Sequence, residues 1–150
     1  MKLHFIVIGL FIAQFGNAYA ETITEEQIEK YKQNYSEQLI PLLKDRMGIE
    51  LEIQSEEDAQ EHVSTLANRM AGCQLVALKG YPQKYQDASI IPVANGVDLR
   101  KANEDLNVMI QEDIKNGEVT DQELKTMTDT AVEKYKACLS DSETDPSMPM

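Results

Sequence analysis

Two cysteines, Cys73 and Cys138, are the only ones in this chain of 150 residues, and 65 positions separate them. A bond between positions so far apart restricts the fold strongly, because the chain-entropy model gives about 4 kcal/mol of stabilisation for closing a loop of that length. A redox-active pair would instead favour C-x-x-C spacing, which lowers the pKa of the attacking thiol. We therefore predict a structural disulfide, which requires an oxidising compartment.

The first 20 residues predict such a compartment. Lys2 precedes an apolar run over 3–13, and the triplet AYA at 18–20 precedes Glu21. This is the pattern of a secretory signal peptide that is cleaved before Glu21. A membrane-spanning helix needs about 20 apolar residues, and this run is shorter. We expect a periplasmic or secreted protein with no membrane span, although Asn34 begins an N-Y-S glycosylation motif that a eukaryote would use.

Loss of the predicted signal peptide changes the composition of the chain. All three phenylalanines leave with it and the chain has no tryptophan, so the core has to be aliphatic, with tyrosine as its only aromatic residue. The remaining 130 residues fit one domain. The formal charge of −12 becomes −13 without Lys2. Such a charge argues against nucleic acid and anionic lipid, which are polyanions, and is compatible with a cationic partner.

Helix start and stop signals divide the rest of the chain. Thr24 with Gln27, and Thr120 with Glu123, form capping boxes, in which each of two residues binds a free backbone N–H of the other. Apolar residues at three- and four-residue spacing follow each start, as in amphipathic helices. The other signals are Ser55 with Asp58 and Asp98 at helix starts, and Gly48 and Asn116-Gly117 at helix ends.

Three stretches interrupt this pattern. Pro41 removes a backbone hydrogen bond and is expected to kink or split the first helix. The alternating sequence IELEIQ at 49–54 is typical of a short strand but has no strand to pair with, so we interpret it as an extended connector. Residues 80–96 contain two prolines and no clear period. We interpret them as a loop, with one helical turn around Tyr85 at most.

The sequence therefore predicts an all-α fold, a four-helix bundle-like single domain over 21–139 that follows a cleaved signal peptide at 1–20. Residues 140–150 are acidic and contain proline, and we expect them to form a disordered tail. Cys138 lies on the apolar stripe of the last predicted helix, and Cys73 lies beside that of the second. The predicted disulfide joins these two helices.

Residues that could carry catalysis or bind a metal are few. Asp58 and His62 are four positions apart on one predicted helix face and form a weak candidate metal site. First turns of helices favour acids for dipole reasons alone, so we interpret this stretch as a solvated helix start and expect no metal or cofactor. A Ser-His-Asp site would also need His62, but no serine lies in a G-x-S-x-G context. We therefore do not expect an enzyme, and a secreted hydrolase is the least favoured alternative.

Binding candidates are more numerous. Tyr81 and Tyr85, flanked by Lys79 and Lys84 in the predicted loop, are candidate partner-binding residues, because tyrosine is favoured at protein interfaces. Each predicted helix also carries a methionine, which favours either core filling or an adaptable binding cavity. These methionines are Met47, Met70, Met109 and Met127.

Export, small size, acidity and the lack of a catalytic motif together favour a function in binding. Our first hypothesis is a non-enzymatic exported protein that binds another protein, as an inhibitor, an immunity protein or a chaperone-like factor. The alternative is a helical carrier of an apolar small molecule, which the methionine distribution would favour.

Overall fold

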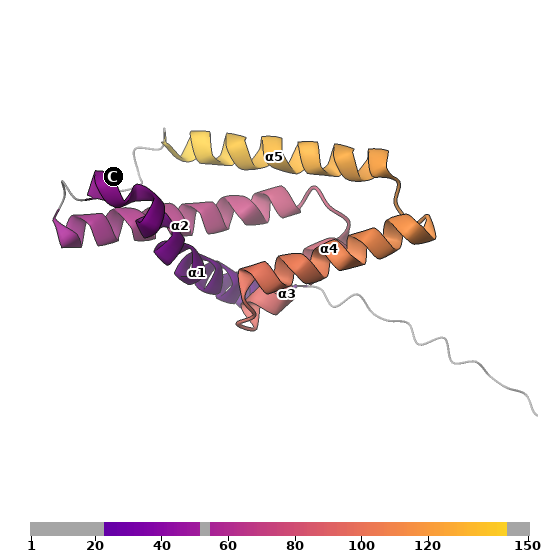
Figure 1. The fold of residues 1–150 in the computed structure, drawn as a ribbon, viewed down its shortest axis with the longest axis horizontal. Coiled ribbons are helices and arrows are strands. Elements are labelled where there is room, and N and C mark those ends of the chain that lie inside the picture. The colour runs from indigo at the N-terminus through magenta and orange to yellow at the C-terminus, as the bar shows by residue number, and fades with distance from the viewer. Residues whose placement is uncertain (1–22, 52–54, 144–150) are drawn as a thin grey trace, which may run out of the picture.

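The computed structural model describes residues 23–51 and 55–143, and this part of the chain is all-α (Figure 1). Its helices are α1 (Glu25–Leu51), α2 (Glu56–Leu78), α3 (Gln83–Ala94), α4 (Leu99–Asn116) and α5 (Asp121–Glu143). The predicted all-α, bundle-like fold is confirmed. The predicted signal peptide at 1–20 lies outside the described residues, as does most of the predicted tail.

The helices pack in a defined order. α1 contacts α2 and α3, α3 contacts α4, and α5 lies along α2. In Figure 1, α2 runs beside α5 over most of its length, whereas α4 leads away from α3 on the other side of α2. No described helix is both long enough and apolar enough to cross a membrane.

The predicted disulfide is confirmed and joins α2 to α5. Cys73 and Cys138 are bonded with their Cα atoms 5.5 Å apart, and Cys73 is buried. The bond lies in the C-terminal part of each helix, so it closes a loop that contains α3, α4 and most of α5.

The predicted helix starts are confirmed by the capping hydrogen bonds. The Gln27 backbone N–H donates to Thr24 Oγ1 at 3.2 Å, while the Thr24 N–H donates to Gln27 Oε1 at 2.8 Å. Thr120 and Glu123 repeat this reciprocal pair at the start of α5. Ser55 and Asp98 accept hydrogen bonds from the first turns of α2 and α4, and Gly117 ends α4 at a φ of 75°.

The main difference from the sequence prediction is α3, which makes five described helices rather than four. Residues 83–94 were predicted as part of a loop, but they form a helix that begins after Pro82 and includes Pro92 in its last turn. Pro92 removes one helical hydrogen bond, and its ring crowds the carbonyl group one turn before it. Burial of Tyr85, Ile90 and Val93 outweighs that cost.

Side chains of α1 also fix the end of α3. The Asn34 carboxamide donates to the backbone oxygens of Val93 and Ala94 at 2.9 and 3.2 Å. Gln38 donates to the Val97 oxygen at 3.3 Å and accepts from the Leu99 N–H at 2.7 Å. These bonds satisfy backbone groups at the α3–α4 turn, and they engage the amide nitrogen on which glycosylation of Asn34 would take place.

Helix boundaries differ from the prediction at two further places. α1 continues through Pro41 and Gly48 to Leu51, so the first residues of the predicted connector at 49–54 are helical, and residues 52–54 lie outside the described residues. α5 extends to Glu143, four residues beyond the predicted end at Leu139. α1 and α5 both pack along α2, and this packing stabilises the helices more than the low helix propensity of the local residues destabilises them.

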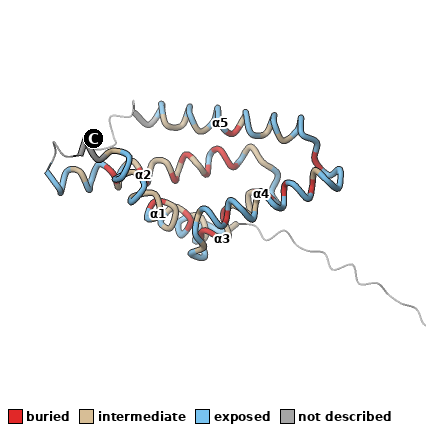
Figure 2. Tube along the Cα trace, viewed as in Figure 1, coloured by how far each residue is buried: buried red, intermediate tan, exposed pale blue. Residues whose placement is uncertain are grey.

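Ten of the sixteen described buried hydrophobic residues fall in two clusters, and five of the other six lie on α2, which carries red segments in Figure 2. One cluster lies where α1, α2, α3 and α4 meet and contains Tyr31, Leu75, Leu78, Ile90, Val93, Ala94 and Ala102. The second lies between α3, α4 and the α4–α5 turn and contains Tyr85, Ile110 and Val119. The core is therefore aliphatic, with a tyrosine in each cluster.

Candidate binding cavity

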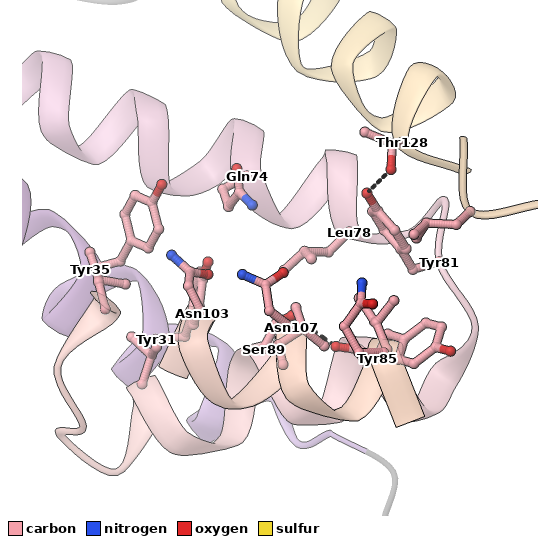
Figure 3. Close-up of a pocket in the computed structure, with 16 residues that line it drawn as sticks. Tyr31, Tyr35, Gln74, Leu78, Tyr81, Tyr85, Ser89, Asn103, Asn107 and Thr128 are labelled. Carbon is pink, nitrogen blue, oxygen red and sulfur yellow. Dashed lines mark hydrogen bonds between the residues drawn. The ribbon is translucent and has the colours of Figure 1, made fainter. Parts of the chain in front are cut away.

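A cavity of about 380 Å³ lies between the two core clusters, and every described helix contributes to its wall. Figure 3 shows Tyr35 at one end of the cavity and Tyr81 at the other, with Gln74, Asn103 and Asn107 between them. The lining side chains with a hydroxyl or carboxamide group are Tyr31, Tyr35, Tyr81, Tyr85, Gln74, Asn103, Asn107, Gln111, Ser89 and Thr128. The apolar ones are Leu78, Val93, Leu99, Leu106, Ile110 and Leu124.

Two tyrosines of α1 form one end of the cavity. The rings of Tyr31 and Tyr35 lie one helical turn apart with centroids at 5.3 Å. Burial raises the pKa of Tyr35 to about 12 and raises the pKa of Tyr31 still further above its ordinary value. Both phenols therefore stay protonated at physiological pH, and they offer apolar ring surface together with hydroxyl groups.

Four carboxamides line the cavity. Asn103, Asn107 and Gln111 follow each other at four-residue spacing along α4, and Figure 3 shows Gln74 of α2 opposite Asn103 and Asn107. None of these four side chains makes a hydrogen bond to another residue in the described part of the chain. Each carboxamide carries two donor hydrogens and an acceptor oxygen, so the cavity offers hydrogen-bonding groups that the fold itself does not use.

The far end of the cavity is closed by a contact between the α2–α3 turn and α5. The Tyr81 hydroxyl donates to Thr128 Oγ1 at 3.3 Å, as Figure 3 shows. Leu124 of α5 lines the same end. α5 therefore does two things: it is bonded to α2 through Cys138, and it covers one end of the cavity.

A cluster of charged residues next to Tyr85 joins α3 to α4 beside the cavity. The Tyr85 hydroxyl donates to Asp113 Oδ2 at 2.5 Å, and Lys84 Nζ lies 2.8 Å from the same oxygen and 3.0 Å from Glu118 Oε2. Lys84, and then the Tyr85 hydroxyl, lower the pKa of the Asp113 carboxyl. Burial raises the pKa of Tyr85, and the two carboxylates raise the pKa of Lys84. These bonds hold α3 against α4.

The four predicted partner-binding residues lie in different environments. Tyr85 is only 1% exposed, so it lies inside the fold and not on the predicted contact surface; its helix α3 turns it inward. Tyr81 is half-buried and lines the cavity, while Lys79 and Lys84 are exposed. A role in partner binding for Tyr81, Lys79 and Lys84 stays a prediction.

Asp58 and His62 both lie exposed near the start of α2. Within the described ranges, no group of three or more His, Cys, Asp or Glu side chains is arranged to hold a metal ion. A secreted hydrolase would need either a pair of acids or His62 in a pocket, and the described residues that line this cavity include neither.

The methionines do not form the cavity that the sequence allowed for. Among the described lining residues there is no methionine. Met127 packs against the core cluster around Tyr85, and Met109 is partly exposed on α4. Tyrosines, carboxamides and aliphatic side chains line most of the cavity instead. The sequence signal that could have found them is the spacing of Asn103, Asn107 and Gln111 on one amphipathic helix.

Comparisons with protein-family models, with curated proteins and with solved structures find no match for this chain. The geometry of the cavity is therefore the basis on which a function can be proposed.

Proposed function

We propose that this protein binds an uncharged amphipathic molecule in the cavity between α2, α4 and α5. The observation that carries the proposal is the wall of the cavity, whose described lining residues include hydroxyls, carboxamides and aliphatic groups but no charged side chain. Charged residues make up 27% of the chain, so about four of sixteen residues would be charged by composition alone.

The size and chemistry of the cavity favour binding. Its volume of about 380 Å³ lies in the range of about 300 to 1,000 Å³ that is typical of small-ligand sites. A charged ligand would lose part of its hydration against this wall without meeting an opposite charge. A neutral ligand would place its apolar part against Leu78 and the tyrosine rings and its polar groups against the carboxamides. The ligand that this wall favours is thus amphipathic, whereas the methionines had suggested an apolar one.

We also propose that the protein is exported and binds its ligand in the periplasm or outside the cell. The N-terminal pattern before Glu21 supports export. The disulfide between α2 and α5 supports it as well, because disulfides persist mainly in oxidising compartments.

The test uses the neutral dye Nile red and two tryptophan variants of α2. Gln74 lines the cavity, whereas Val76, two residues further on, is 39% exposed and lies outside the lining. We expect Nile red fluorescence to rise on binding to the wild type and to the Val76→Trp variant. The Gln74→Trp variant should bind at least about 10-fold more weakly, since the indole fills the middle of the cavity.

Native mass spectrometry of the protein purified from its own host provides a second readout. A bound neutral molecule that is lost in the Gln74→Trp variant would support the proposal. If dye binding is equal in all three proteins and no molecule co-purifies, the cavity is not a binding site.

A further inference from the structure

The spacing of the carboxamides on α4 is close to the repeat of an extended peptide. Asn103, Asn107 and Gln111 repeat every four residues, and a helix rises 1.5 Å per residue, so successive carboxamides are about 6 Å apart along the axis. Alternate residues of an extended polypeptide repeat at about 6.4 to 6.8 Å. Over the two steps from Asn103 to Gln111 the mismatch along the axis accumulates to about 1 to 2 Å. The row also turns by about 80° around α4, because each residue turns a helix by about 100°, so the matching strand crosses α4 obliquely.

On this basis, and resting on the proposed binding function, we infer that the ligand is a short extended peptide segment whose main chain hydrogen-bonds to the Asn103, Asn107 and Gln111 carboxamides. A carboxamide donates through its nitrogen and accepts through its oxygen, as the peptide group does, so each one can bind both an N–H and a C=O of the ligand. None of the three is occupied by a hydrogen bond to another described residue.

The rest of the wall indicates which side chains the peptide carries. Successive side chains of an extended peptide point to opposite sides, so those that point away from α4 would enter the cavity. There they would meet Leu78 and the rings of Tyr35 and Tyr81 (Figure 3). Since no described lining residue is charged, these side chains are apolar or hydroxylated.

A peptide ligand could be a segment of another protein, which would agree with the hypothesis of a protein partner. An uncharged extended stretch occurs in unfolded chains and in exposed termini of other proteins, and its main chain provides affinity that depends little on sequence. A neutral oligosaccharide also pairs with carboxamides and tyrosine rings, and its hydroxyls both donate and accept. A peptide group, however, holds its N–H and its C=O in a fixed geometry that matches the nitrogen and the oxygen of a carboxamide, and this match favours a peptide.

The experiment uses a pool of acetylated, amidated tetrapeptides built from Ala, Val, Leu, Ser and Tyr, with the full disulfide-bonded protein. Native mass spectrometry selects the peptides that bind, and calorimetry measures their affinity. We expect N-methylation of alternate peptide nitrogens, which removes main-chain donors and leaves the side chains, to weaken binding at least about 10-fold.

Variants of the α4 carboxamides test the proposed hydrogen bonds to the peptide main chain. We expect the double variant Asn103→Ala/Asn107→Ala to bind the selected peptide about 10- to 100-fold more weakly, which is the loss of two hydrogen-bonding groups. Asn68→Ala is the matched control, since Asn68 is exposed on α2 and does not line the cavity. Asn103 and Asn107 are themselves exposed, so the double variant should keep the thermal unfolding midpoint of the wild type.

The outcomes separate this inference from the proposed function. If peptides bind but N-methylation or the double variant leaves their affinity unchanged, recognition of the main chain is wrong. If no peptide binds while Nile red or a neutral oligosaccharide binds and Gln74→Trp prevents it, the cavity function stands and the peptide inference is wrong. If nothing neutral binds, both are wrong.

Discussion

Tyr85 is the residue that connects the core of this protein to its cavity. Its ring is buried between α3 and α4, its hydroxyl bonds Asp113, and Lys84 lies 5.2 Å from the centre of the ring. A buried phenol needs a partner for its hydroxyl, and a carboxylate is a strong acceptor. Because Tyr85 also lines the cavity, the same bond that holds α3 against α4 helps to fix the shape of the cavity.

We expect Tyr85→Phe to lower the free energy of unfolding by about 1.5 to 3 kcal/mol at pH 7, the cost typical of losing a hydrogen bond to a charged group. Urea unfolding followed by circular dichroism measures it. The control is Tyr81→Phe, whose longer hydroxyl contact to Thr128 is exposed and should cost less. A Tyr85→Phe variant as stable as the wild type would show that the Asp113 contact contributes nothing.

The hydrogen bond between Tyr85 and Asp113 should make the free energy of unfolding depend on pH. The fold lowers the pKa of Asp113, so its contribution to stability is present above the ordinary carboxyl pKa of about 3.9 and is lost as the pH falls through the lower, folded value. The stability difference between wild type and Tyr85→Phe should therefore shrink below about pH 4. Unfolding curves at pH 7 and pH 3 measure this change, and a difference that is equal at both would contradict it.

At the scale of helices, α5 is one of the two helices that the disulfide joins. It packs mainly along α2, its N-terminus follows a tight turn after Gly117, and its C-terminal part is bonded to Cys73. The Tyr81–Thr128 contact is a further point of attachment and lies at the cavity. Loss of the disulfide should therefore affect α5 more than the helices that form the core around Tyr31.

We expect the double variant Cys73→Ala/Cys138→Ala to lose up to about 4 kcal/mol of stability, because the unfolded chain regains the entropy of a 65-residue loop. Hydrogen exchange should rise first in α5, and reduction of the wild type followed by alkylation should have a similar effect. Uniform loss of protection in all five described helices would indicate that α5 unfolds only together with the core.

The helix starts were predictable, while one whole helix was not. Thr24, Ser55, Asp98 and Thr120 bind backbone N–H groups within three residues of themselves, so a short sequence contains all the partners of each cap. α3 has no such cap, since Pro82 occupies its N-terminal position and Pro92 lies inside it. Its stability comes from contacts with α1 and α4, which its own twelve residues do not show.

At the scale of the whole molecule, the acidic surface and the uncharged cavity have different roles. The chain has a formal charge of −12, whereas the described residues that line the cavity carry no charged side chain. The residues of the cavity come from positions 31 to 128 and meet only because α2 lies between α1 and α5 (Figure 1).

Export predicts the mass of the mature protein. Cleavage before Glu21 should give an intact mass that corresponds to residues 21–150 with two hydrogens fewer than the reduced chain, because the disulfide is formed. Mass spectrometry of the protein from culture medium or periplasm measures both. A species that begins at Met1, or one with two free thiols, would contradict export.

The sequence by itself determined the all-α class, the capped helix starts and the disulfide, because these depend on local hydrogen bonds, on helical periodicity and on a single pair of cysteines. Only the tertiary structure decided that 83–94 is a helix, that Tyr85 is buried and that Asn103 and Asn107 face Gln74 across a cavity. Carboxamides on a helix surface look alike in a sequence whether water or another helix faces them. Their convergence is decided by how distant helices pack.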